Sequence, residues 1–254
     1  MKILNKSVLG AMLAPIFLIS IISCGGNGDG DANSNAVQEI VGSGNIVEET
    51  RGVVGATGVE LSGEASLTIK QGTPEQLVLR TDDNLMSLII TEVKDNILVI
   101  GSQPNTDIEP SQTIEADLTL NTIDTINLSG VGNIASSNLT TNHLELTMTG
   151  VGDIAISNLE SLTLDALISG VGDVSISGIV EDQIINFSSI GEYKSDNLNS
   201  KTADVEVSNI GSATIRVSTS LNANITGSGS VFYHGSPAVT RTGTGSGTVV
   251  QLSP

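Results

Sequence analysis

Aromatic residues are nearly missing from this 254-residue sequence, which has no tryptophan, two tyrosines and three phenylalanines. A core built on aromatic packing is therefore excluded, although an apolar fraction of 39 % is too high for a disordered chain. Isoleucine, valine, leucine, threonine and serine fill the stretches between 28 glycines. Because β-branched residues suit a pleated, half-buried surface, this composition predicts an all-β protein.

Basic residues are also scarce, since ten lysines and arginines stand against 28 acidic residues and give a formal net charge of −18. Nucleic-acid binding needs clustered positive charge to neutralise phosphates, so no nucleic-acid partner is expected. An acidic surface is compatible with divalent cations, or simply with solubility outside the cell.

Cysteine occurs once, as Cys24, so an intramolecular disulfide is excluded. It follows a segment with two early lysines and an apolar run over residues 8–22, which predicts a secretory signal peptide over residues 1–23. The run is shorter than the roughly 20 residues that a membrane-spanning helix needs. The tetrapeptide Ile21-Ile22-Ser23-Cys24 resembles the lipobox of bacterial lipoproteins.

That resemblance implies that the Cys24 thiol is acylated and that Cys24 becomes the new N-terminus. Several acyl chains on one residue give stable membrane anchoring, because each buried methylene contributes about 0.8 kcal/mol. The next residue is Gly25 and not the Asp associated with inner-membrane retention, so the expected location is the cell envelope, at an outer membrane. Residues 24–40 are rich in Gly, Asn, Asp and Ser and predict a flexible tether.

Seven glycine-centred motifs recur through the second half of the chain at a spacing of 18 to 20 residues. A fixed period of this length is typical of a solenoid, in which each repeat completes its core against its neighbours. The motifs are Ser129–Asn133, Thr149–Asp153, Ser169–Asp173, Ser188–Glu192, Ser208–Ser212, Thr226–Ser230 and Thr244–Thr248.

Apolar residues stand at fixed positions around each motif: four and two residues before the first residue of its glycine triplet, and four residues after it. Positions two residues apart face the same side of a strand, so each repeat is predicted to be a strand, a tight glycine turn and a strand. The phase is the same in every repeat, which favours a parallel β-helix over a sandwich. In the last repeat Arg241 and Gly243 replace the apolar residues, as expected for a polar end coil.

The same register fits earlier segments around Gly63 and, 21 residues upstream of it, around Gly42. Strands are predicted over residues 76–80, 86–93 and 97–100, with a turn at Asp95-Asn96. Residues 101–110 contain two prolines and predict a loop. Gly63 and Gly130 lie 67 positions apart, and the residues between them are expected to form larger coils or coils with protrusions.

The order of these motifs resembles a family of bacterial envelope proteins, the putative auto-transporter adhesin, head GIN domain family. The resemblance covers residues 41–254 and implies a right-handed parallel β-helix with coils of about 18–21 residues, often in a lipoprotein. It supplies no catalytic or ligand-binding residue. The chain departs from the pattern at Ala65 and at Ser189-Ile190. The motifs that carry the resemblance are Gly42–Ile46, Gly58–Gly63, Asp82–Leu85, Glu92–Asp95 and the Ser-Gly-Val-Gly-Asp repeats.

One column of polar residues follows the second glycine of each motif, namely Asn133, Asp153, Asp173, Glu192, Ser212, Ser230 and Thr248. In stacked coils such neighbours lie roughly 4.8 Å apart, so Asp153, Asp173 and Glu192 would form a ladder of carboxylates. One hypothesis is a weak Ca²⁺ site along this ladder. The alternative is that Asn, Asp and Ser simply suit a tight turn.

Catalytic residues are not predicted. His143 and His234 lie about 90 residues apart with no shared motif, and nucleophile elbows and phosphate loops are missing from the sequence. The favoured hypothesis is a lipid-anchored, non-enzymatic envelope protein, adhesive or structural, that contacts a surface glycan, a protein or a second copy of itself. The alternative is a carbohydrate-active β-helix enzyme, which would need two carboxylates and a basic residue gathered in a lateral groove.

Overall fold

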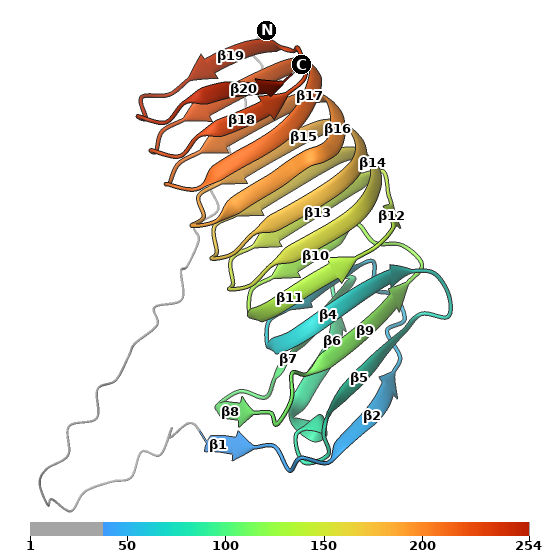
Figure 1. Cartoon of the computed structure of the whole chain (residues 1–254). Helices are drawn as coiled ribbons and strands as arrows, with labels where there is room; N and C mark the ends of the chain where they lie inside the picture. Colours follow the sequence, from blue (N-terminus) through green and yellow to red (C-terminus); the bar gives the residue numbers. More distant parts are fainter. Residues whose placement is uncertain (1–37, 254) are drawn as a thin grey trace, which may run out of the picture. The chain divides into compact units, whose positions relative to one another are not determined.

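The computed structural model describes residues 38–253, which form a β-solenoid of about six turns. Figure 1 shows the coils stacked in sequence order from green through yellow to red. Within the described range there are twenty strands and one three-residue 3-10 helix, η1 (Met86–Leu88), and no helix there is long and apolar enough to cross a membrane. The predicted β-helix is confirmed, and its right-handed sense stays a prediction. The signal segment 1–23 and Cys24 lie outside the described residues.

Each turn of the solenoid contains three stretches of strand. In one turn they are separate, as β11 (Val131–Ser136), β12 (Leu139–Thr140) and β13 (His143–Met148). In the following turns they merge into long strands that pair in parallel, one coil on the next. These long strands are β14 (Ile154–Ile168), β15 (Val174–Phe187), β16 (Glu192–Val207) and β17 (Ser212–Ile225).

Register is kept at one repeat per coil, so residues of one column become direct neighbours. Leu146 pairs with Ala166, and Ile154 pairs with Val174. The predicted inward columns are buried, apart from Val249, which is partly buried. They are Ile126, Leu146, Ala166, Ile185, Val205 and Ala223; Leu128, Met148, Ile168, Phe187, Val207 and Ile225; and Ile134, Ile154, Val174, Tyr193, Ala213, Val231 and Val249.

A polar cluster interrupts this aliphatic core. The Gln183 side chain accepts hydrogen bonds from Tyr193 Oη at 3.2 Å and Ser195 Oγ at 3.3 Å, and donates to Ser200 Oγ at 2.8 Å. Burial raises the pKa of the Tyr193 phenol above its ordinary value. Because these polar groups have partners inside the core, they avoid the penalty of unsatisfied burial.

The first coil of the stack lies between two others. Its strands, β3 (Gly58–Leu61) and β4 (Glu64–Gln71), pair in parallel with β10 (Thr125–Leu128) and β11 on one side. On the other side they pair in parallel with β7 (Ile97–Ser102) and β9 (Glu115–Leu120). The register predicted around Gly63 is therefore confirmed. The residues between Gly63 and Gly130 add strands on the far side of this coil before the chain returns to continue the stack.

Antiparallel strands close this end of the stack. β2 (Ile46–Arg51) runs antiparallel to β5 (Gln76–Asp82), and β5 runs antiparallel to β9. β6 (Ile89–Lys94) and β7 form a hairpin whose turn residues Asp95 and Asn96 have φ of 50° and 66°, which confirms the predicted turn. The strand predicted over residues 86–93 begins with η1, so its first residues were assigned wrongly.

Two further predictions at this end are wrong. Residues 101–110 are not all loop, because β7 extends to Ser102 and β8 (Thr106–Glu109) pairs with β1 (Gln38–Val41), a strand that begins within the predicted tether. The Gly42 motif belongs to no parallel coil, since the strand after it joins the antiparallel sheet. The buried Asp82 carboxylate accepts a hydrogen bond from the Gly44 N–H at 2.7 Å and so holds this glycine loop in place.

The hydrogen bonds that fix Asp82 also affect its ionisation. The Ser111 hydroxyl donates to its carboxylate at 2.6 Å, and the backbone N–H groups of Ser111 and Gly44 add two more bonds. These bonds, the Ser111 hydroxyl first, hold the pKa of Asp82 below its ordinary value.

The opposite end of the described stack is more polar. It contains β18 (Val231–His234), β19 (Ala238–Thr242) and β20 (Val249–Ser253), and all five residues of β19 are exposed. Arg241 pairs with the buried Ala223 but is itself exposed, and its Nη2 donates to the carbonyls of Gly245 and Gly247 at 3.0 Å. The predicted loss of the apolar columns in the last repeat is confirmed.

Candidate binding surfaces

The glycine motifs form a corner at which successive coils approach very closely. A Cβ atom on Gly172 would lie 2.0 Å from the carbonyl oxygen of Gly152, and the φ of Gly172 is +135°. A Cβ on Gly170 would similarly lie 2.1 Å from the Gly150 oxygen. Only glycine fits such contacts, so the repeat of glycines keeps the corners of neighbouring coils directly above one another.

The residue between the two glycines points outward and forms an apolar line along the corner. We call the five residues in this line the apolar ridge. Parallel bridges join its first four members in turn, which places these four one coil apart, and the fifth takes the same place in the next motif. They are Val131, Val151, Val171, Ile190 and Ile210, and between 49 % and 64 % of each is exposed.

Serine takes the same place in the last two motifs, as Ser228 and Ser246, and both are exposed. This position faces solvent in all seven motifs, so burial does not explain the apolar residues of the other five. The ridge was not predicted, although a Val or Ile repeats at the centre of the first five motifs. An exposed apolar line of this kind indicates a contact surface.

The predicted polar column lies beside the ridge, and its first three side chains hold the backbone of the next coil. Asn133 Oδ1 accepts a hydrogen bond from the Asp153 N–H at 3.0 Å. Asp153 Oδ1 accepts from the Asp173 N–H at 2.8 Å, and Asp173 Oδ1 from the Glu192 N–H at 2.9 Å. The column is therefore part of the stacking, as its turn-forming residue types suggested.

Lys194 neutralises the end of this ladder. Its Nζ lies 2.7 Å from Asp173 Oδ2 and 3.0 Å from Glu192 Oε2. The hydrogen bond from Lys194 is the main cause that lowers the pKa of Asp173, and the same bond raises the pKa of Lys194. Across residues 38–253 no three acidic, histidine or cysteine side chains are placed to hold a metal ion. The calcium ladder of Asp153, Asp173 and Glu192 stays a prediction to which this geometry adds no support.

Two clusters combine carboxylates with a base, as the enzyme alternative requires. One is Lys194 with Asp173 and Glu192. In the other, Arg80 contacts Glu48 at 2.8 Å and Asp117 at 2.9 Å across the antiparallel strands, with Glu115 at 3.4 Å. The hydrogen bond to Glu48 is the main cause that raises the pKa of Arg80. Lys194 lines a surface depression of about 230 Å³, but Asp173 and Glu192 are not part of its lining. In each cluster the basic side chain forms ion pairs with the carboxylates around it, so the charges within the cluster compensate each other.

The histidines form no catalytic pair. His143 begins β13, where its Nδ1 lies 2.6 Å from Thr163 Oγ1 and its Nε2 lies 3.9 Å from Asp165 Oδ2. His234 ends β18, several coils away.

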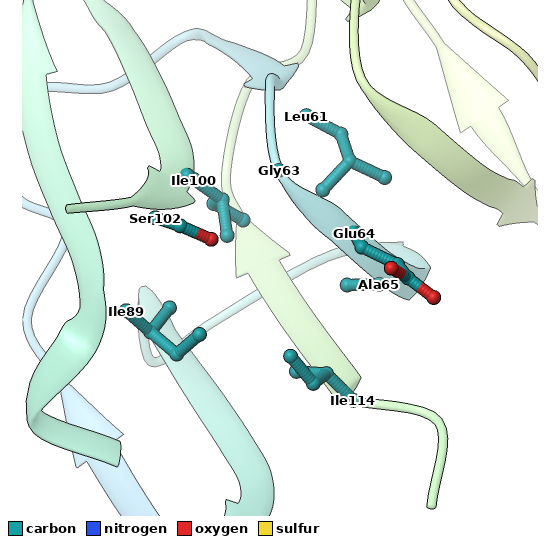
Figure 2. A pocket seen from close by; sticks show the side chains of 9 residues that line it. Leu61, Gly63, Glu64, Ala65, Ile89, Ile100, Ser102 and Ile114 are labelled. Carbon is teal, nitrogen blue, oxygen red and sulfur yellow. The ribbon is translucent and has the colours of Figure 1, made fainter. Parts of the chain in front are cut away.

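A small apolar cavity lies between the first coil and the hairpin of β6 and β7. Figure 2 shows Leu61, Ile89, Ile100 and Ile114 around it. Its volume is about 10 Å³, which is about the space of one water molecule. This cavity is too small to hold an organic ligand, so the candidate surfaces are on the outside of the solenoid.

Comparison with known proteins identifies the family of this chain. A family model described as "Putative auto-transporter adhesin, head GIN domain" matches residues 56–237. Among solved structures, a putative adhesin from Bacteroides fragilis NCTC 9343 aligns with a TM-score of 0.81 and 25 % identity, over 84 % of this chain and 100 % of the other. No curated protein matches the chain.

Two more distant structures share the fold. A putative lipid binding protein from Parabacteroides distasonis ATCC 8503 aligns with a TM-score of 0.72 and 20 % identity, over 85 % of this chain and 100 % of the other. A putative adhesin from Parabacteroides merdae ATCC 43184 aligns with a TM-score of 0.63 and 19 % identity, over 85 % and 99 %. Because the family model matches most of the solenoid, the chain belongs to the putative auto-transporter adhesin, head GIN domain family.

Proposed function

We propose that this protein is a lipid-anchored, non-enzymatic adhesin of the cell envelope that makes contact through its apolar ridge. The observation that carries the proposal is the ridge itself, in which five half-exposed apolar side chains occupy a position where Ser228 and Ser246 are also accommodated. Family membership adds support, since the family is described as adhesins without a known catalytic role. The contacted surface is a protein, a glycan or another copy of the chain.

Anchoring rests on the Ile21-Ile22-Ser23-Cys24 sequence and the polar tether that follows it. Replacing Cys24 by serine removes the thiol that would be acylated, so nearly all of the protein is expected to leave the membrane fraction. Fractionation of cells that express the full chain, with radiolabelled palmitate incorporation, measures this. Equal membrane retention of the Cys24→Ser variant and the wild type would refute lipid anchoring. Recovery with the inner membrane would refute the outer-membrane location.

The adhesive role of the ridge is tested by replacing two of its central valines with serine, the residue that the last two motifs have at this position. The Val151→Ser/Val171→Ser variant should keep its fold, because both side chains are 49 % exposed and fill no part of the core. Adherence of expressing cells to polystyrene and to one another should fall by about tenfold, as expected when two apolar contact residues are lost.

The matched control is Leu162→Ser/Ile179→Ser, which removes two exposed apolar residues away from the ridge. It should leave adherence near the wild-type level. Equal adherence of all three proteins, at equal surface amounts, would show that the ridge makes no adhesive contact.

A further inference from the structure

A second surface feature runs along a different face of the solenoid, on the strand segments that precede each glycine motif. Three depressions lie there, with volumes of about 410, 320 and 170 Å³. The first two share His143 and Glu145, and the last two share Ile184 and Asn186, so they form one continuous trough. We call it the acidic trough.

Strand register shows how the trough is built. One of its two outward-facing columns spans all three depressions, and each residue of this column pairs directly with the next coil's residue. Five steps of roughly 4.8 Å give the trough a length of about 24 Å. The column consists of Thr125, Glu145, Asp165, Ile184, Asp204 and Asn222.

The trough is strongly acidic and is not neutralised like the other carboxylate groups of the solenoid. Five acidic residues line the three depressions, and no lysine or arginine is part of their lining. Lys194 neutralises carboxylates of the ladder beside the ridge, and Arg80 neutralises carboxylates of the antiparallel sheet. The five acids are Asp124, Glu145, Asp165, Asp204 and Glu206.

Asp165, near the middle of the trough, lacks compensation most clearly. Its side chain is 44 % exposed, but its Oδ1 is shielded from solvent and has no hydrogen-bond donor, and its Oδ2 lies 3.9 Å from His143 Nε2. Its neighbour in the next coil is Ile184, of which 43 % is exposed. A carboxylate in this setting favours a partner that brings positive charge and N–H donors.

We propose that the acidic trough binds an extended polypeptide segment rich in lysine or arginine. A trough that continues across several coils fits an extended chain better than a globular partner. Basic side chains would reach the carboxylates, and their aliphatic stems would pack on Ile184 and Leu167. Charge disfavours anionic glycans and nucleic acids as occupants. This surface is separate from the ridge, so the inference is independent of the proposed adhesive contact.

The test uses the mature protein and a fluorescent octalysine peptide, with binding measured by anisotropy at several salt concentrations. The Glu145→Gln/Asp165→Asn/Asp204→Asn variant removes three charges from the trough. The matched control, Glu39→Gln/Glu92→Gln/Glu109→Gln, removes three charges from exposed sites on β1, β6 and β8. Affinity should fall by about tenfold or more in the trough variant, and change by no more than about twofold in the control.

Equal weakening in both variants would mean that only net charge attracts the peptide, and would overturn the proposal. Failure of octalysine to bind the wild type would overturn it too. If the triple variant does not fold, Glu145→Gln alone should still weaken binding, because this side chain is exposed. The Val151→Ser/Val171→Ser variant should bind the peptide normally, which separates this test from that of the ridge.

Discussion

Replacing Gly172 by alanine is expected to lower the free energy of unfolding by at least about 3 kcal/mol. The new Cβ would lie 2.0 Å from the Gly152 carbonyl oxygen, at a φ of +135° that side chains rarely adopt. The nearby contact is backbone of the adjacent coil, so it cannot be relieved by turning a side chain. Relief requires the two coils to separate at their corner.

Urea denaturation followed by circular dichroism measures this loss, and the chain contains a matched control. Gly52 has no atom within 4 Å of an added Cβ and no positive φ, so Gly52→Ala should change stability by no more than about 0.5 kcal/mol. If Gly172→Ala were as stable as Gly52→Ala, the close approach of the corners would not be required for stacking.

The corner glycines also explain where the outward side chains lie. Because Gly150, Gly170 and their equivalents stack directly, the residue that follows each one stands above its counterpart in the previous coil. This produces the apolar ridge. The same register aligns the column of the acidic trough on another face. One repeated backbone contact therefore sets the position of both proposed surfaces.

The parallel stack could be predicted because its cause is local and repeated. Each motif combines glycines at a tight corner with apolar residues two positions apart, and both features are visible in the sequence. The Gly42 motif shows the limit of this reasoning. Its glycines serve a loop held by the buried carboxylate of Asp82, a contact between residues some 40 positions apart that no local pattern reveals.

The insertion after the first coil was unpredictable for a similar reason. β7 and β9 pair with β3 and β4 on the side opposite to β10 and β11, so the order of coils in space differs from the order in sequence. Strand propensity identifies such strands but does not choose which edge of an existing coil they join. The antiparallel pairing of β2 with β5 depends on the same choice.

Surface features were predicted only in part. The column of Asn133, Asp153 and Asp173 was identified from its spacing, but its side chains accept hydrogen bonds from the next coil's backbone. The ridge could have been found, since its residues repeat with the motif. The trough was not predicted, although the residues of its main column, Glu145, Asp165 and Asp204 among them, also repeat with the motif.

The central claim is that the glycine motifs fix the register of successive coils, so that each residue pairs with the residue one repeat further along the chain. A disulfide between two paired positions tests this register most directly. In a Cys24→Ser background, Ala155→Cys and Ser175→Cys would place thiols on directly paired residues of adjacent coils. Their Cα atoms would be roughly 4.8 Å apart, within the range that a disulfide spans. Mild oxidation should therefore convert nearly all of the protein to the internally linked form.

The control pairs Ala155→Cys with Ser177→Cys, on the same face but two residues out of register, at a Cα separation of about 8 Å. It should stay reduced under the same conditions, as measured by thiol labelling and intact mass. Linkage of the control with none in the paired variant would place the coils in a different register, and both proposed surfaces would lose their basis.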